Sequence, residues 1–166
     1  FGACMSPTTA FHILQGIETL GLRMQRHVDN TRHVVAFLQE NDMVASVSYP
    51  ELEDHPDREL AQQLLPRGCG AVFSFELKGG RDAGIAFVDA LDLFSHLANV
   101  GDAKSLVIHP ASTTHYRRDV AALAAAGISA GTIRLSIGLE QVEDLIGDLK
   151  QGLRAAEKAA AREAAQ

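Results

Sequence analysis

The sequence predicts an α/β chain of the α+β-like kind, in which a small sheet has helices on one face and follows a long amino-terminal helix. Two observations carry this prediction. Residues 71–77 and 131–138 alternate apolar and polar side chains, as half-buried strands do. Residues 7–41 instead repeat apolar side chains every three or four positions, as one helix face does. Helices on one side leave the other face of the sheet open, so we expect a missing domain or a partner subunit to cover it.

The long helix is expected to begin at Pro7, because Ser6 can cap it and proline is tolerated in a first helical turn. Its length of ~30 residues exceeds the ~8–20 residues of most globular helices, which favours a helix that bridges two layers or two domains. A strand over residues 43–49 and a short helix over residues 58–65 follow, separated by an acidic loop.

Strands and helices alternate through the rest of the chain. A Lys-Gly-Gly turn follows residue 77 and ends the strand expected over residues 71–77. Gly127 ends one of the helices, because glycine suits the left-handed position after a helix. The expected strands are residues 71–77, 105–108 and 131–138, and the expected helices are residues 81–93, 116–126 and 142–164.

The composition is that of a single domain that handles small molecules or proteins. The 166 residues are 46% hydrophobic and have a formal net charge of −6, whereas a nucleic-acid partner calls for a basic face. Cys4 and Cys69 lie far apart without CxxC spacing, so we expect a reducing cytoplasm and no disulfide framework. No segment has the length of a membrane span or the pattern of a signal peptide. Because Phe1 is not a methionine, we expect the chain to be part of a longer one.

Arg134 is the side chain that points most directly to a ligand. The alternation of its strand sends it to the face opposite Ile133 and Leu135. A half-buried guanidinium needs an anionic partner, and its planar fork fits a carboxylate or phosphate. No acidic residue lies nearby on that strand face, which favours a ligand; pairing with a structural carboxylate stays open as the alternative. His109 and His115 fit no common metal spacing, so no metal site is expected.

Several stretches share their order and spacing with one enzyme family over almost the whole chain. They are residues 14–20 (LQGIETL), 49–50 (YP), 70–75 (GAVFSF), 99–106 (NVGDAKSL), 109–115 (HPASTTH) and 133–140 (IRLSIGLE). In these stretches the chain resembles the carboxy-terminal part of the Cys/Met-metabolism family of pyridoxal 5'-phosphate (PLP) enzymes. Residues 94–103 are similar to the O-acetylhomoserine sulfhydrylase branch. The cystathionine γ-synthase and methionine γ-lyase branches usually have Ser-Leu-Gly where this chain has Asn99-Val100-Gly101.

The resemblance implies the carboxy-terminal domain of a fold-type-I PLP-dependent transferase. Residues 1–40 would link it to a missing PLP domain, and residues 41–166 would close over the substrate. The whole enzyme would replace the acetate of O-acetylhomoserine with sulfide or a thiol, which yields homocysteine or methionine in methionine biosynthesis. It would assemble as a cytoplasmic homotetramer. None of the four lysines lies in a segment like the family's cofactor-lysine motif, so PLP would be bound by the missing amino-terminal part and this chain alone would be inactive.

Three substrate-binding residues follow from the resemblance, and no catalytic, cofactor-binding or metal-binding residue does. Arg134 matches the arginine that holds the substrate α-carboxylate. Asn99 stands where relatives have a serine near the substrate, and its amide could still bind the carboxylate. Thr114 matches a threonine that lines the pocket, although its hydroxyl could instead stabilise a turn. Two non-enzymatic alternatives stay open, namely a freestanding small-ligand binding module and a plain interaction domain.

Overall fold

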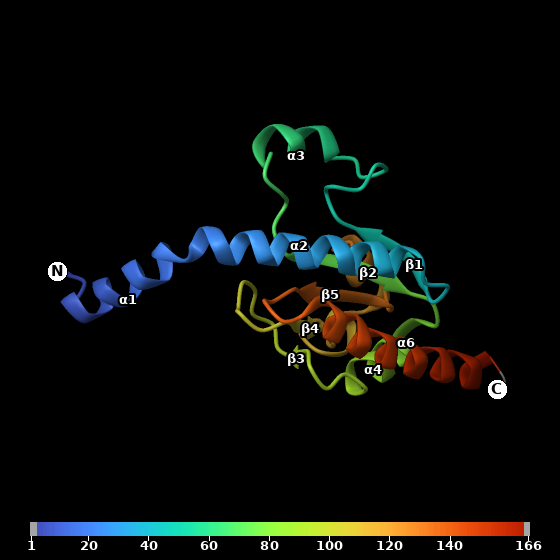
Figure 1. The fold of residues 1–166 in the computed structure, drawn as a ribbon. Helices are drawn as coiled ribbons and strands as arrows, with labels where there is room; N and C mark the ends of the chain where they lie inside the picture. The colour runs from blue at the N-terminus through green and yellow to red at the C-terminus, as the bar shows by residue number, and fades with distance from the viewer. Residues whose placement is uncertain (1–2, 165–166) are drawn as a thin grey trace.

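The computed structural model describes residues 3–164 and contains a five-stranded sheet in the order β1-β2-β5-β4-β3 (Figure 1). Antiparallel pairing joins β1 to β2, β2 to β5 and β5 to β4, whereas β3 runs parallel to β4. The strands are β1 (Val44–Ser48), β2 (Val72–Leu77), β3 (Ser95–His96), β4 (Leu106–Ile108) and β5 (Thr132–Ser136).

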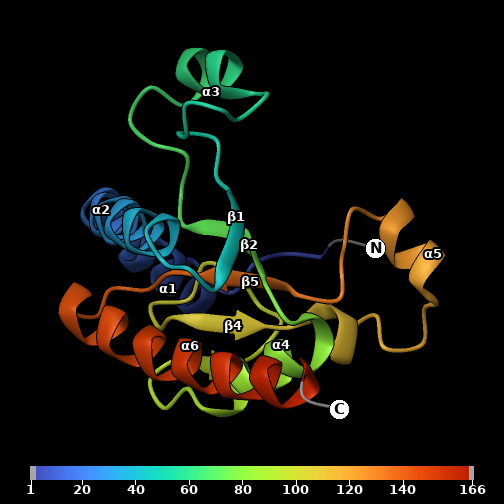
Figure 2. The same ribbon diagram turned by 90° about the vertical axis from the view of Figure 1, so that its right-hand side faces the viewer.

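Helices cover one face of this sheet, which confirms the predicted fold class. Figure 2 shows α4 and α6 together on one side, while the segment that contains α3 rises on the other side. α2 packs against α6 and β1 at the edge of the sheet. The helices are α1 (Pro7–Glu18), α2 (Leu20–Gln39), α3 (Arg58–Leu64), α4 (Gly80–Asp89), α5 (Val120–Ala125) and α6 (Val142–Ala164), with a short 3-10 helix η1 (Pro110–Ser112).

The core lies between the sheet and the α4/α6 layer. Alternation along β2 and β5 turns Phe75 and Ile133, which are paired across the two strands, toward these helices. The ring of Phe87 from α4 packs edge-on against Phe75, with ring centroids 5.6 Å apart. Leu149 of α6 is fully buried in the same cluster. The opposite face of the two central strands carries mainly polar residues, with Val72 as the apolar exception.

The expected single helix over residues 7–41 is wrong at one point, because α1 and α2 meet at Thr19 (Figure 1). The guanidinium of Arg23 donates to the carbonyl oxygen of Gly16 and to the hydroxyl of Thr19. The Gly16 carbonyl thus has a side-chain donor at the break. Gly16 and Gly21 on either side weaken the helix, since glycine is the poorest helix former after proline.

Two other helices are shorter than expected. The predicted helix 116–126 contains only α5, since Asp119 is its cap and accepts a hydrogen bond from the Ala122 amide at 2.7 Å. The predicted helix 81–93 ends with α4 at Asp89. The carboxylate of Asp148, far along the chain, accepts hydrogen bonds from the amides of residues 92–94 and holds them outside the helix.

The short strand β3 was not predicted, because a two-residue strand has too few side chains for an alternation. Its amide at Ser95 donates to the carbonyl oxygen of Ser105 at 3.0 Å, just before β4.

None of the helices described between residues 3 and 164 has the length and apolar character needed to cross a membrane.

Candidate functional site

Arg134 lies at the middle of β5, on the face of the sheet that α4 and α6 do not cover. Its cross-strand neighbours are Ser74 on β2 and Ile108 on β4. The side chain is half-buried, and one of its terminal nitrogens donates to the carbonyl oxygen of Ala98. Among the described residues, no ion pair involves this guanidinium. Its charge therefore has a neutral acceptor but no carboxylate partner in the part of the chain that the structure describes.

A cavity of about 440 Å³ opens beside Arg134 on this face. It brings Arg134 and Thr114 together, as expected of two residues of one pocket. The Thr114 hydroxyl lies 2.8 Å from Nδ1 of His115, so the hydroxyl is part of a local pair as well as of the lining. The polar side chains that line the cavity are those of Ser48, His55, Ser74, Thr114, His115, Thr132 and Arg134.

Asn99 does not line this cavity. It is exposed in the loop between β3 and β4, next to Ala98, whose carbonyl receives the Arg134 hydrogen bond. A second, more open hollow of about 620 Å³ is lined by both Ala98 and Thr114. Arg134 and Thr114 thus line the same cavity, whereas Asn99 lines neither hollow and is linked to Arg134 only through its chain neighbour Ala98.

The sequence analysis missed several residues of the cavity. Ser74 could have been found, because alternation along its strand places it on the polar face and the antiparallel register sets it directly opposite Arg134. His55 and His115 come from loops, whose positions no periodicity predicts. Among the described residues, no group of three or more histidine, cysteine and acidic side chains could hold a metal ion.

His109 is a structural residue rather than a ligand. Its ring is buried and lies 2.8 Å from both the Ala130 carbonyl oxygen and the Ser112 hydroxyl. Burial, which disfavours the charged imidazolium, lowers the pKa of His109. The ring therefore fixes η1 against the chain segment that leads into β5.

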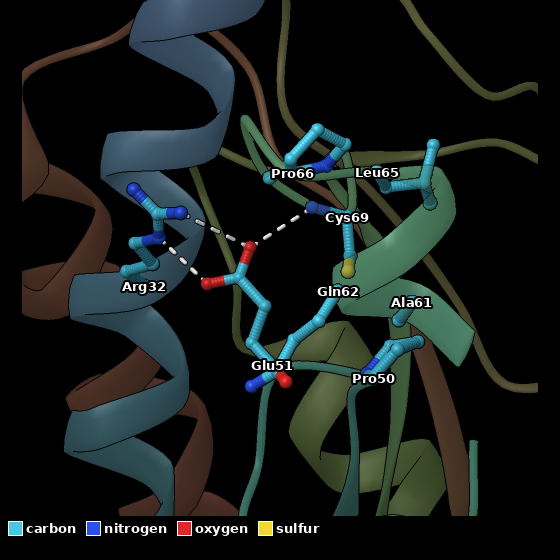
Figure 3. A pocket seen from close by; sticks show the side chains of 9 residues that line it. Arg32, Pro50, Glu51, Ala61, Gln62, Leu65, Pro66 and Cys69 are labelled. Carbon is cyan, nitrogen blue, oxygen red and sulfur yellow. Dashed lines mark hydrogen bonds and ion pairs between the residues drawn. The ribbon is translucent and has the colours of Figure 1, made fainter. Parts of the chain in front are cut away.

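A further hollow of about 320 Å³ lies between α2 and α3 (Figure 3). The Arg32 guanidinium donates to both carboxylate oxygens of Glu51, at 2.7 and 3.2 Å, and the Cys69 amide donates to the same carboxylate at 2.9 Å. Figure 3 shows these groups turned toward one another. This charged pair is satisfied within the chain, so the hollow is not a candidate ligand site. We call the contacts of Glu51 with Arg32 and with the Cys69 amide the latch, because they tie the α3 segment to α2.

The Glu51 carboxylate contributes to stability in a pH-dependent way. Partial burial opposes its ionisation, but the hydrogen bonds from Arg32 and from the Cys69 amide outweigh this, so the pKa of Glu51 is lowered below 4.5. A carboxyl group with a lowered folded-state pKa stabilises the fold above its unfolded-state pKa. This contribution is lost as the pH falls through the folded-state value.

Glu51→Gln is expected to lower the free energy of unfolding by about 1–3 kcal/mol at neutral pH, because Arg32 loses the negative charge of its partner and one of the two carboxylate oxygens that accept its hydrogen bonds. Urea denaturation measures this loss, which should shrink as the pH is lowered below 4.5. Glu53→Gln is the matched control, since the Glu53 side chain is 91% exposed and lies 3.8 Å from Arg58. An equal loss in both variants would contradict the latch.

The lysines of this chain do not fit a PLP site. Lys78, Lys104, Lys150 and Lys158 are all exposed, and none of them lines the cavity beside Arg134 in the described part of the chain. Lys150 lies over the ring of Phe37, 5.7 Å from its centroid. A Schiff base to PLP requires a lysine in the site. The cavity therefore offers groups for an anion and not for the cofactor linkage.

The profile of the family "Cys/Met metabolism PLP-dependent enzyme" matches residues 1–154. An O-acetyl-L-homoserine sulfhydrylase of Corynebacterium glutamicum is 45% identical over 93% of the chain and 35% of its own length. An L-methionine gamma-lyase of Fusobacterium nucleatum is 45% identical over 92% of the chain and 38% of its own length.

Two solved structures are also similar to this chain in fold and in sequence. A putative O-acetylhomoserine (thiol)-lyase of Campylobacter jejuni, whose crystal structure contains a pyridoxyl-lysine, superposes with a TM-score of 0.83 at 41% identity, over 92% of this chain and 36% of that one. A cystathionine gamma synthase of Xanthomonas oryzae reaches 0.83 at 45% identity, over 93% and 40%. The chain spans little more than a third of the length of the curated relatives. It belongs to the Cys/Met-metabolism family of PLP-dependent enzymes.

Proposed function

We propose that this chain is the carboxy-terminal, substrate-closing domain of an O-acetylhomoserine sulfhydrylase. The enzyme replaces the acetate of O-acetylhomoserine with sulfide or a thiol, so that a carbon–sulfur bond forms as the carbon–oxygen bond to acetate breaks. The observation that carries the proposal is the cavity of about 440 Å³ beside Arg134, whose guanidinium has no carboxylate partner between residues 3 and 164. An amino-acid carboxylate matches that guanidinium in charge and shape.

Arg134 holds the substrate α-carboxylate, and Thr114 lines the same pocket. Asn99, in the loop that contains Ala98, donates its amide to the carboxylate when the substrate is bound. PLP supplies the electron sink of the reaction and is held by the part of the enzyme outside this chain. Because the lysines here are exposed and remote from the cavity lining, the chain's own residues bind and orient the substrate.

Residues 1–40 link this domain to the preceding PLP domain. The last turns of α2 pack into the core of residues 41–166, whereas α1 has no buried residue. Phe11, Leu14 and Ile17 of α1 are each more than half exposed and recur at helical spacing. Figure 1 shows α1 extending away from the sheet. An apolar helix face of this kind indicates a contact surface, and the preceding domain of the same chain is the partner that covers it.

The loop that contains Asn99 favours the sulfhydrylase over the related activities, whereas sequence identity separates them little, since an L-methionine gamma-lyase is also 45% identical to this chain. Sulfhydrylases of Corynebacterium glutamicum and Thermus thermophilus are 45% and 49% identical to this chain. The loop reads Asn99-Val100-Gly101, whereas the γ-lyase and cystathionine γ-synthase branches usually have Ser-Leu-Gly. We place the enzyme in the cytoplasm as a homo-oligomer.

The test uses the full-length protein that contains this chain, loaded with PLP. We expect homocysteine and acetate from O-acetyl-L-homoserine and sulfide, or methionine when methanethiol replaces sulfide. Cystathionine formed from cysteine, or a 2-oxo acid released from methionine, at a higher kcat/KM would instead identify one of the other branches. The 166-residue chain alone is the negative control, and it should show neither turnover nor the visible absorbance of bound cofactor.

A further inference from the structure

Two buried polar side chains of α2 face the end of β5. His27 is 4% exposed and Asn30 is 2% exposed, although a helix packed on a core normally buries apolar residues there. Thr31, the other buried polar residue of α2, is satisfied within the helix, because its hydroxyl donates to the carbonyl oxygen of His27. The donors of His27 and Asn30 are directed out of the helix instead.

Both side chains bind backbone carbonyl groups that follow the Arg134 strand. Nδ1 of His27 lies 2.6 Å from the carbonyl oxygen of Ile137 and donates to it. The amide of Asn30 donates to the carbonyl oxygens of Gly138, at 3.0 Å, and Glu140, at 2.9 Å. The backbone of residues 137–140, which we call the β5 exit, is thus hydrogen-bonded to α2 through three of its carbonyl groups. The first of these carbonyls lies three residues beyond Arg134.

The same exit is tied to the loop between β3 and β4. The Glu140 carboxylate accepts hydrogen bonds from the Ser105 amide at 2.7 Å and from the Ser105 hydroxyl at 2.9 Å. That hydroxyl accepts one from the Gly138 amide at 2.7 Å. A Cβ on Gly138 would lie 2.5 Å from the Ala103 carbonyl oxygen, so only glycine allows this close approach. We call His27, Asn30, Ser105 and Glu140 the clamp.

The loop held by the clamp contains the polar partner of Arg134. Ala98, whose carbonyl oxygen receives the guanidinium hydrogen bond, lies in this loop beside Asn99. A second tie comes from the Gly101 amide, which donates to the Ser136 hydroxyl at 3.1 Å. The clamp thus sets both the strand that carries Arg134 and the loop that orients its guanidinium.

A buried polar network of this kind adds little net stability but specifies one arrangement, because each unmet donor or acceptor costs free energy. We propose that His27 and Asn30 are positioning residues, which act through the clamp to hold Arg134 and the loop at residues 97–104 in place for a substrate carboxylate. This inference rests on the proposed function. It makes α2, the helix that links the two domains, part of the substrate-binding apparatus.

The test compares His27→Leu and Asn30→Leu with wild type in the PLP-loaded, full-length protein. Each variant removes donors to the β5 exit, so we expect KM for O-acetylhomoserine to rise about tenfold while kcat falls much less. His27→Asn restores a donor near the position of Nδ1 and should recover most of the wild-type KM. His33→Leu is the matched control, because His33 is an exposed histidine of the same helix and bonds only to the Asp29 carbonyl oxygen.

A purely structural role would lower the unfolding midpoint without changing KM, and this result would overturn the inference. Where either leucine variant does not fold, Ser105→Ala takes its place, because it removes one hydroxyl from the clamp; an unchanged KM in that variant is equally decisive against it. Arg134→Leu in the same assay keeps the two proposals apart. If it raises KM and the clamp variants do not, only the clamp is wrong, whereas an unchanged KM in Arg134→Leu would refute the carboxylate site itself.

Discussion

Arg134→Leu in the full-length protein is expected to raise KM for O-acetylhomoserine about 30-fold, with a smaller change in kcat. A charge-assisted hydrogen-bonded pair contributes about 2 kcal/mol, which corresponds to this factor. Leucine fills a similar space along the strand but offers no donor to a carboxylate. Steady-state kinetics with varied O-acetylhomoserine and saturating sulfide measure the effect, and KM for sulfide should stay close to the wild-type value.

Arg134→Lys separates charge from geometry. The ammonium keeps the positive charge but loses the planar fork that binds two carboxylate oxygens, so KM should lie between those of the wild type and the leucine variant. Thermal unfolding of all three proteins shows whether a change in KM follows from a loss of fold. Because Arg134 has no ion pair among the described residues, its removal should leave the unfolding midpoint nearly unchanged. Equal KM values in all three proteins would exclude a carboxylate at this residue.

The sheet could be predicted from the sequence wherever one of its faces is buried. β2 and β5 alternate over five residues or more, and the buried Phe73 and Leu135 set their register directly. Because successive side chains of a strand point to opposite faces, burial of Leu135 places Arg134 on the open face. α6 was predicted with its observed bounds, because its apolar residues recur at helical spacing, and the stripe of Leu145, Leu149, Leu153 and Ala156 is buried in the core as α6 packs against α4 and α2.

Elements that depend on distant residues could not be predicted. The end of α4 is set by Asp148, which lies on α6 and captures three amides after the helix. β3 exists because its two residues pair with β4 across a loop. In both cases a tertiary contact decides between local conformations of similar free energy. The break at Thr19 is different, because the Arg23 side chain that donates there comes from the same stretch of chain, four residues later.

The candidate site also contains residues whose positions follow from a local pattern and residues whose positions depend on the rest of the fold. Arg134 follows from strand alternation, whereas the positions of Asn99 and Thr114 depend on loops and were expected only from the family resemblance. The clamp gave no sequence signal, because His27 and Asn30 on a helical pattern look like surface residues. Their burial results from packing of α2 against the β5 exit. The face on which a strand residue such as Arg134 lies can therefore be predicted here, whereas the positions of side chains in loops or polar networks need the three-dimensional fold.

Phe87→Ala is expected to lower the free energy of unfolding of the 166-residue chain by about 3–5 kcal/mol. The ring is fully buried, packs edge-on against Phe75 and contacts Gly152 of α6 closely enough that a Cβ there would lie 2.9 Å from it. Removing it leaves a cavity between α4 and the sheet that the surrounding backbone cannot close. Urea denaturation followed by circular dichroism measures the loss through the shift of the midpoint at constant slope.

Phe11→Ala makes the same substitution on α1 and is the matched control. Phe11 is 57% exposed in this chain, so its removal should change the free energy of unfolding of the chain by no more than about 0.5 kcal/mol. In the full-length protein the same variant should cost more, because the preceding domain is proposed to cover this helix face. A large loss in the isolated chain would mean that α1 packs on its own sheet. Equal, small losses in both proteins would mean that α1 has no partner, and residues 1–40 would then not link two domains in the proposed way.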